Sequence, residues 1–501
     1  MTGKPGHGAV TRLITRSTIF VIARFVPMGA SFLLLPLYTK YLTTSDYGIV
    51  ALATTFSNIL TILCLQSVEG AFGRFYYDIQ EDARRREFFG ANWLFLLFYS
   101  LAVCGVVEIA GSLIGTLGFQ DIPYQPYLRL VVWTVFLNTV ALSLPRALFL
   151  VREQAWQYAG VNLAVFGIST LLIVDFIVIR GEGALGNLRG TFFGTAIVAA
   201  VGLVVTLRNI RFVLHWSYIR AALMFVVPAI PHLLALWALN LSDRFILQQY
   251  VSLADVGVYS FGATIGSVVL LIALSVAEAI NPFYYRTAST HAQASSILAR
   301  LATYYVALIA WLGVGMVALV REVVSMIAAR PEYNAAVQVV PLVVAGCVAL
   351  SFYYVFVAAV YYSKRLRWLP VVTGISSATS ICLNLLLIPR LGYIGAALTT
   401  FISFSLQAVA MYRVARGVFP LPYEWRRLTI VVVLAVGASA GLFFFNLANV
   451  WLSLALKGLL ALLFPLLLWG MRFFSTEELA WFGAAMRQWR AGLPSLVAPR
   501  Q

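Results

Sequence analysis

The sequence predicts an all-α polytopic membrane protein, and three observations lead to this fold class. The chain has 501 residues, of which 61% are hydrophobic and only 11% are charged. Soluble domains carry about 25% charged residues, so the bilayer must be the solvent for most of this surface. The apolar residues form long runs, and a membrane-spanning helix needs roughly 20 of them. A decapeptide pattern also occurs twice, which is typical of transporters that are duplicated at half their length.

The repeat aligns polar as well as apolar residues. The first copy is Tyr41–Val50 and the second is Tyr250–Tyr259, an offset of 209 residues. Tyr, Asp and Gly keep their spacing, at Tyr41, Asp46 and Gly48 in the first copy and at Tyr250, Asp255 and Gly257 in the second. The same offset relates Glu69 to Glu278. The chain is therefore expected to contain two related halves.

The apolar runs give about fourteen candidate spans. Six lie in the first half, at about 15–39, 46–70, 90–117, 128–151, 156–179 and 188–208. Six lie in the second half, at about 219–241, 255–279, 298–320, 335–362, 368–388 and 393–415. A last pair follows at about 428–447 and 450–472. We expect a six-helix bundle over 15–208, a linker over 209–218, a second bundle over 219–415 and a final helix pair over 428–472.

The distribution of basic residues predicts the orientation. Of the 35 Lys and Arg residues, 25 fall in one alternate set of loops, and cytoplasmic loops collect such residues. The opposite, outer loops hold nine: Lys40, Arg129, Arg180, Arg189, Arg244, Arg321, Arg330, Arg390 and Lys457. Both termini, including residues 1–14, are therefore expected in the cytoplasm. The net charge of +16 needs no nucleic-acid partner. Residues 475–501 carry apolar and basic positions at helical spacing, which predicts an amphipathic helix on the cytoplasmic membrane face.

The sequence gives little sign of catalysis. The four cysteines lie in apolar runs and the four histidines share no ligand spacing. We find no nucleotide-binding loop, nucleophile elbow or zinc-protease motif, and no loop is long enough for a catalytic domain. We therefore expect a protein that is not an enzyme and has neither a cofactor nor a metal site.

Asp46 and Asp255 carry helix-start signals. Each follows a hydroxyl residue by three positions, Thr43 and Ser252, just ahead of an apolar run. This is the spacing at which a Ser or Thr caps a helix and an acid in the first turn completes the cap. We interpret both aspartates as structural.

Arg24 is the charge most deeply placed in a predicted span. It lies about 12 Å beyond Arg16 at the rise of a helix, and an intramembrane charge costs about 2.5–3.5 kcal/mol unless it faces a cavity or a partner. We expect it to line a cavity, with a structural ion pair and snorkelling as alternatives. Pro27 and Pro36 follow and would bend the same helix.

Other candidate site residues also lie in predicted spans. Four acids could couple an ion or form ion pairs: Glu69, Glu108, Asp175 and Glu278. Glu108 and Asp175 could also pair with Arg24. Arg146 follows Pro145 and is placed equally well at the interface or in a lumen. Tyr353 and Tyr361 lie on one predicted helix and could line a sugar path.

Three motifs resemble one transporter family. Pro36–Leu42 running into Asp46-Tyr47-Gly48, then Arg74–Asp78, then Asp243–Leu247, are similar to the Wzx-type polysaccharide flippases of the multidrug/oligosaccharidyl-lipid/polysaccharide exporter superfamily. The resemblance covers essentially the whole chain in segment number and repeat. Because its motifs are loop and helix-start patterns, they identify the fold better than the substrate.

The resemblance implies a specific activity. Such proteins use alternating access to move undecaprenyl-diphosphate-linked oligosaccharide repeat units from the cytoplasmic to the periplasmic leaflet of the bacterial inner membrane, for surface polysaccharide biosynthesis. A coupling ion (H⁺ or Na⁺) and a polysaccharide polymerase are possible partners. A cationic cavity suits a diphosphate, because Arg binds phosphate bidentately. The main alternative is a multidrug-type cation antiporter of the same superfamily, whose cavity should be acidic. A membrane-embedded glycan enzyme is a remoter alternative.

Overall fold

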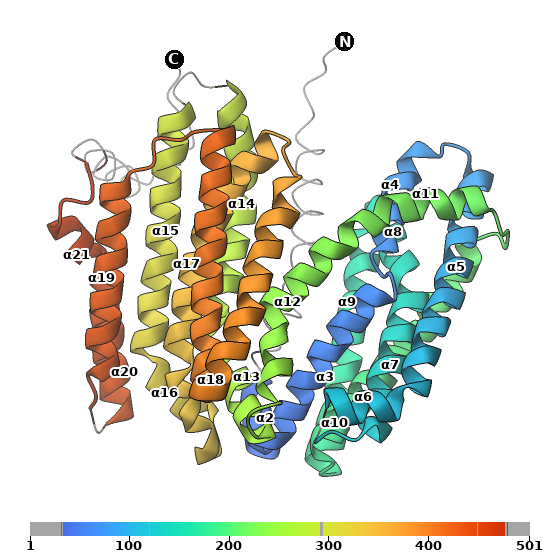
Figure 1. The fold of residues 1–501 in the computed structure, drawn as a ribbon, viewed down its shortest axis with the longest axis horizontal. Coiled ribbons are helices and arrows are strands. Elements are labelled where there is room, and N and C mark those ends of the chain that lie inside the picture. The colour runs from blue at the N-terminus through green and yellow to red at the C-terminus, as the bar shows by residue number, and fades with distance from the viewer. Residues whose placement is uncertain are drawn as a thin grey trace, which may run out of the picture. The chain divides into compact units, whose positions relative to one another are not determined.

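The computed structural model describes residues 32, 34–119, 121–290, 294–447, 449–475 and 478. Every regular element in these ranges is helical (Figure 1), which confirms the predicted all-α class. Within the same ranges, 12 helices are long and apolar enough to cross a membrane. The count of fourteen spans stays a prediction, because most of the segment 15–39 lies outside the described residues.

The described chain divides into two compact units that do not follow the predicted halves in sequence. The first unit comprises residues up to 267 together with 324–346 and 366–410, and the second comprises 268–323, 347–365 and the residues from 411 onward. Several helices pass from one unit into the other. The predicted division at 15–208 and 219–415 is a statement about the repeat, and it stays a prediction.

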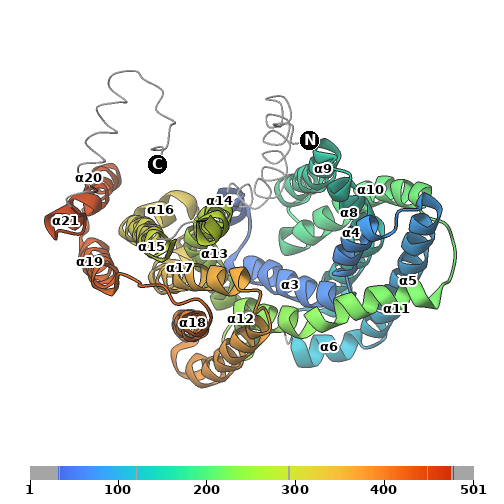
Figure 2. The same cartoon turned by 90° about the horizontal axis from the view of Figure 1, so that it is seen from above.

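The first unit begins with a succession of helices of very different lengths. These are α2 (Leu35–Tyr41), α3 (Thr44–Leu63), α4 (Val68–Asp78), α5 (Asp82–Ile109), α6 (Gly111–Gly118), η1 (Tyr124–Leu128), α7 (Arg129–Leu137), η2 (Asn138–Leu142), α8 (Ser143–Val151), α9 (Ala155–Val174), η3 (Asp175–Ile179), α10 (Gly183–Asn209), α11 (Trp216–Val226), η4 (Val227–Ala229), α12 (Ile230–Leu247) and α13 (Leu253–Gly266). Helices α4, α8, α9 and α10 lie next to one another (Figure 2).

The remaining helices follow the same order as the predicted spans. They are α14 (Val268–Thr290), α15 (Ala294–Ala318), α16 (Val320–Ile327), η5 (Pro331–Gln338), α17 (Val340–Tyr362), α18 (Trp368–Val418), α19 (Trp425–Phe444), α20 (Val450–Leu462) and α21 (Phe464–Gly470). The backbone of α18 leaves the helical region at Gly392, so α18 consists of two helical segments joined by a kink. This break falls between the two spans predicted at 368–388 and 393–415.

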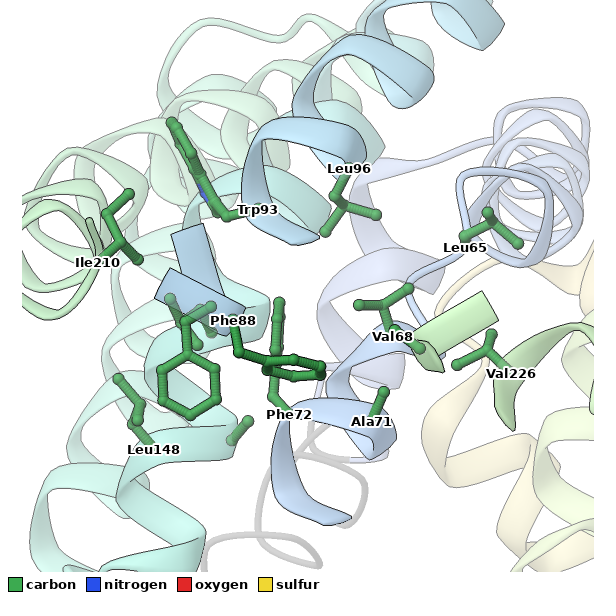
Figure 3. Packing of buried hydrophobic residues seen from close by; sticks show 14 of the residues in the cluster. Leu65, Val68, Ala71, Phe72, Phe88, Trp93, Leu96, Leu148, Ile210 and Val226 are labelled. Carbon is green, nitrogen blue, oxygen red and sulfur yellow. The ribbon is translucent and has the colours of Figure 1, made fainter. Parts of the chain in front are cut away.

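A hydrophobic cluster in the first unit joins α4, α5 and α8 to α11. Phe72 and Phe88 lie at its centre (Figure 3), each about 1% exposed. Trp93 closes one side and donates a hydrogen bond through Nε1 to the carbonyl of Val140 at 2.8 Å. Because these aromatic residues pack against one another inside the unit, they do not contribute to an interfacial aromatic belt.

The predicted helix caps are confirmed in both copies of the repeat. Thr43 Oγ1 accepts a hydrogen bond from the Asp46 amide at 3.1 Å, and Asp46 Oδ2 accepts one from the Thr43 amide at 3.1 Å. In the second copy, Ser252 Oγ accepts from the Asp255 amide at 3.2 Å. Asp46 has a further role, because its Oδ1 accepts from the amide of Ala184 at the start of α10, at 3.1 Å.

The two repeat copies contact each other directly inside the first unit. A Cβ added at Gly48 would lie 2.2 Å from the carbonyl oxygen of Leu253, and a Cβ added at Gly257 would lie 1.8 Å from that of Thr44. Thr44 and Leu253 are themselves repeat equivalents. Helices α3 and α13 therefore cross in a reciprocal contact, as expected for two copies related by an approximate twofold axis.

The structure extends the repeat to residues that the motif comparison missed. Gly183 and Gly392 differ by the same 209 positions, and both have φ of +56°. Gly186 and Gly395 follow at the same offset, and each approaches the backbone of the preceding helical segment, at Phe176 and at Leu387 respectively. A residue with a side chain would have a strained backbone at Gly183 and Gly392, and its side chain would collide with the neighbouring backbone at Gly186 and Gly395.

Candidate functional site

One cluster of polar residues in the first unit lies where two helices are broken. The first break separates α3 from α4, over residues 64–67, and Leu65 there has a φ of 57°. The turn contains Gln66, and Glu69 lies in the first turn of α4. Broken helices are tolerated at membrane depth where the free backbone lines a protein interior or a cavity.

The second break is the short π-helix η2 between α7 and α8. Pro145 has no amide hydrogen, so one carbonyl of the preceding turn loses its helical donor. The indole of Trp93 donates to the carbonyl of Val140 in this turn. Short π-helical turns within longer helices occur frequently at functional sites. Here the turn places Asn138 and Arg146 on either side of the irregular backbone.

Arg146 connects the two breaks. Its NH1 group donates to Asn138 Oδ1 at 2.8 Å, and Gln66 Nε2 donates to the same oxygen at 3.5 Å. Glu69 lies close enough to interact electrostatically with Arg146. The Nε of Arg146 is buried and has no hydrogen-bond partner among the described residues. The guanidinium therefore points into the unit and keeps a donor that could bind a ligand.

This arrangement favours an anionic or polar ligand over a metal or a reacting group. Arg146 offers a planar set of donors to phosphate or carboxylate oxygens. Asn138 and Gln66 add neutral polar groups that can orient such a ligand. Glu69 offsets part of the positive charge. We see no nucleophile with an adjacent base in the described part of this cluster.

Glu108 and Asp175 lie in local ion pairs. Glu108 Oε1 is 2.8 Å from Nε of Arg129, and its Oε2 accepts a hydrogen bond from Tyr124 at 2.9 Å. Asp175 Oδ2 is 2.9 Å from NH2 of Arg180. Both acids lie near helix ends, beside arginines that the charge count had assigned to outer loops. Among the described residues, the ion pairs suggested from the sequence for these acids are made with Arg129 and Arg180.

Glu278, Tyr353 and Tyr361 belong to the second unit. Glu278 is exposed and lies close enough to Tyr354 for an electrostatic interaction. Tyr353 packs edge-on against Tyr354, with ring centroids 5.4 Å apart. Tyr361 is 48% exposed. Their suggested roles stay predictions.

It is Tyr354, rather than Tyr353, that lines a pocket in the second unit, together with Asn281, Tyr284 and Tyr305. The enclosed space of about 30 Å³ has room for one or two water molecules. A sugar ring would not fit there without movement of the helices. Arg24, the first choice for a cavity-lining cation, lies outside the described residues, and its role stays a prediction.

Sequence reasoning missed one buried ion pair. Lys457 Nζ is 2.7 Å from Glu322 Oε1, and the side chains are 0% and 5% exposed. The charge count had treated Lys457 as an outer-loop residue. Its position seven residues into α20, within an apolar run, was the available signal, because a charge inside a span needs a partner.

Comparison with known protein families gives a match that covers more than half of the chain. Residues 38–338 match the family described as polysaccharide biosynthesis protein. A protein of the Lsg locus of Haemophilus influenzae is 25% identical over 282 residues, which is 54% of this chain and 65% of that protein. The chain thus spans less than two thirds of this relative's length.

Two solved structures share the fold. A lipid II flippase, MurJ, in an inward closed conformation has a TM-score of 0.74 at 12% identity, and covers 91% of this chain and 100% of its own. An inward-facing multidrug resistance transporter of the MATE family has a TM-score of 0.61 at 14% identity, and covers 83% of this chain and 99% of its own. Both are transport proteins rather than enzymes. The predicted transporter fold is confirmed.

Proposed function

Since this chain belongs to the family of polysaccharide biosynthesis proteins, in agreement with its resemblance to Wzx-type flippases, we propose that it moves a lipid-linked oligosaccharide across the membrane. The finer proposal is that the lipid is undecaprenyl diphosphate and that transport runs from the cytoplasmic to the periplasmic leaflet of a bacterial inner membrane. The fold shared with a lipid II flippase supports the class of substrate.

The observation that carries the proposal is the Arg146 cluster. A half-buried guanidinium whose buried Nε is uncommitted, held by Asn138 within broken helices, is suited to bind a diphosphate. Fixed positive charge in such a site lowers the cost of bringing a lipid head group away from water. The hydrocarbon chain of the substrate can stay in the bilayer. Arg24 would add a second cation if it faces the same cavity.

Glu69 suggests how transport is coupled to an ion. Its carboxylate lies near the guanidinium of Arg146. A diphosphate that binds Arg146 would compete with Glu69 for the same positive charge. Release of Glu69 would favour its protonation or its binding of Na⁺, which links substrate binding to a coupling ion. A polysaccharide polymerase beside the protein would accept the exported repeat units.

The orientation belongs to the same proposal. The excess of Lys and Arg in alternate loops supports cytoplasmic termini. A cysteine introduced in place of Lys364 should then be shielded from an impermeant thiol reagent in intact cells, and one in place of Glu332 should be labelled. Labelling at position 364 but not at position 332 would indicate the opposite orientation.

The test of the function is the export of lipid-linked oligosaccharide in a deletion strain complemented with Arg146 variants. Arg146→Gln should abolish export and leave lipid-linked intermediates in the cytoplasmic leaflet, while Arg146→Lys should retain part of the activity. Arg152→Gln is the matched control, because Arg152 also donates to an asparagine, Asn209, at 2.9 Å. That control should export normally.

A structural effect of the substitution can be separated from a loss of binding. Arg146→Gln leaves the half-buried Glu69 without its counter-charge, and an unpaired charge in a protein interior is destabilising. The double variant Arg146→Gln with Glu69→Gln restores neutrality. It should be present in the membrane at normal abundance and still fail to export. Normal export by the double variant would show that Arg146 only balances Glu69 and does not bind the head group.

A further inference from the structure

A pocket at one end of the first unit is not used by the proposed transport site. It lies where η1 leads into α7, beside α10, and encloses about 320 Å³ of space. Helices α7 and α10 are neighbours in the fold (Figure 1). Six residues line the pocket: Gln125, Pro126, Arg129, Leu130, Trp133 and Phe192. Its volume falls within the range of about 300–1,000 Å³ that is usual for ligand sites.

The lining changes from polar to apolar along the helix axis. Gln125 and Arg129 are exposed at the end of the span, whereas Leu130, Trp133 and Phe192 are half-buried. Trp133 follows Arg129 by one helical turn and therefore lies about 6 Å deeper in the membrane than Arg129. The charge count predicts that this end faces the periplasm. A ligand that matches the pocket therefore has a polar head at the membrane surface and a hydrocarbon chain below it.

Arg129 supplies the head-group contact. Its Nε is 2.8 Å from Glu108 Oε1, and its side chain remains 50% exposed. A guanidinium held by its Nε can present its terminal nitrogens to a phosphate. Glu108 is itself fixed by Tyr124, whose hydroxyl donates to it at 2.9 Å. The arginine is therefore held in place at the rim of the pocket.

The charges at this site select among phosphate-bearing lipids. Arg129 and Glu108 together carry no net charge, so the site does not offset the several negative charges of a diphosphate. A phosphodiester, with one negative charge, is the better match. A head group without phosphate would leave the arginine donors unused. Trp133 and Phe192 provide the aromatic surface that is typical of the membrane interface.

We propose that this pocket binds a glycerophospholipid of the surrounding leaflet, with its phosphodiester on Arg129 and an acyl chain along Leu130, Trp133 and Phe192. This proposal is independent of the transported substrate. The bound lipid would connect η1, α7 and α10 at the membrane surface. It would also hold this end of the first unit at a fixed depth in the bilayer.

The test uses the purified full chain in detergent with phosphatidylglycerol, phosphatidylethanolamine or farnesyl diphosphate added at equal concentration. Native mass spectrometry gives the fraction of protein that carries each lipid. The wild type should retain either phospholipid in preference to farnesyl diphosphate. Arg129→Gln should lower the retained fraction about tenfold, the loss expected for charge-assisted hydrogen bonds. Arg129→Lys, which keeps the ion pair with Glu108, should lower it less.

Arg180→Gln is the matched control. Arg180 also pairs with an acid at the same predicted membrane face, at 2.9 Å, and is 56% exposed, but it does not line the pocket. Its substitution should leave lipid retention unchanged. The contact with the acyl chain is tested separately. Trp133→Ala should lower lipid retention, whereas Trp156→Ala, at a tryptophan that is 75% exposed, should not.

Three results would overturn the proposal. Equal losses for Arg129→Gln and Arg180→Gln would indicate general attraction of lipid to surface charge. Preferential retention of farnesyl diphosphate would assign the pocket to a prenyl carrier instead of a phospholipid. Unchanged retention in Arg129→Lys, Arg129→Gln and Trp133→Ala, all eluting as folded protein in gel filtration, would show that the pocket holds no lipid.

Discussion

The crossing of α3 and α13 predicts a sharp effect for a single methyl group. In Gly257→Ala the new Cβ would lie 1.8 Å from the carbonyl oxygen of Thr44, whereas Cβ contacts below 3.0 Å essentially never occur. The two helices must therefore separate by at least about 1.2 Å, or their backbones must bend. Overpacking of this kind costs about 1–3 kcal/mol, although alanine by itself favours a helix by about 1 kcal/mol over glycine.

The neighbouring backbone has little freedom to move away. Thr43 and Asp46 fix the start of α3 by their reciprocal cap. The hydroxyl of Tyr333 donates to the carbonyl of Thr43 at 3.0 Å, and the Tyr333 ring packs against Tyr47. We therefore expect the strain to appear as lower stability rather than as local relaxation.

The assay is thermal unfolding of the purified protein in detergent, followed by tryptophan fluorescence at a fixed heating rate. Gly257→Ala should lower the midpoint temperature of unfolding. Gly105→Ala is the control, because a Cβ at this helical position has no neighbour within 4 Å, and it should leave the midpoint equal or higher. The reciprocal contact makes a further prediction for Gly48→Ala. The double variant should lose less than the sum of the two single variants, since one separation of the helices relieves both clashes.

The reasoning is refuted if Gly257→Ala unfolds at the same temperature as Gly105→Ala. Strictly additive effects of Gly48→Ala and Gly257→Ala would also contradict it. In that case the two glycines would act at independent sites, and the reciprocal contact between repeat copies would be absent in the membrane.

Three further predictions concern charged groups. Asp46→Asn should destabilise the protein by about 1 kcal/mol more than Asp255→Asn. The two carboxylate oxygens of Asp46 accept hydrogen bonds from the amides of Thr43 and Ala184, and asparagine has only one oxygen to replace them. Equal unfolding temperatures of the two variants would contradict this dual role of Asp46. Lys457→Met should lower the midpoint more than the charge-free pair Lys457→Met with Glu322→Gln, since a single removal leaves a buried charge. Burial raises the pKa of Glu322, but hydrogen bonds from Lys457 and Ser453 outweigh burial and hold this pKa below its ordinary value of 4.5. The ion pair therefore stabilises the protein fully above about pH 4.5, and this stabilisation is lost as the pH falls below that value. On acidification the unfolding temperature of the wild type should fall further than that of the charge-free double variant. Equal decreases in the two proteins would contradict this.

Local patterns in the sequence predicted the helix starts correctly. The spacing of Thr43 with Asp46 and of Ser252 with Asp255 lies within one helical turn, so the cap depends on few other residues. The bridge from Asp46 to Ala184 was not predictable, because the two residues are 138 positions apart. Gly183 and Gly392 were overlooked in the repeat because a glycine in an apolar sequence carries little information until its positive φ is known.

The partners of the charged residues required the tertiary structure. From the sequence, Glu108 and Asp175 were expected to couple an ion or to form ion pairs, but Arg129 and Arg180 were not identified as their partners. Lys457 had been counted with the outer loops and is instead fully buried against Glu322. The suggested sugar path at Tyr353 and Tyr361 stays a prediction.

The sequence by itself determined the membrane class, the helical composition and the duplication, because these follow from hydropathy, length and spacing along the chain. The tertiary structure decided which polar groups meet. Arg146 could have lain at the interface or inside the unit, and the breaks at Gln66 and at Asn138 turn it inward. The free energy of a buried charge depends on what surrounds it in space, and that arrangement comes from helix packing between distant segments.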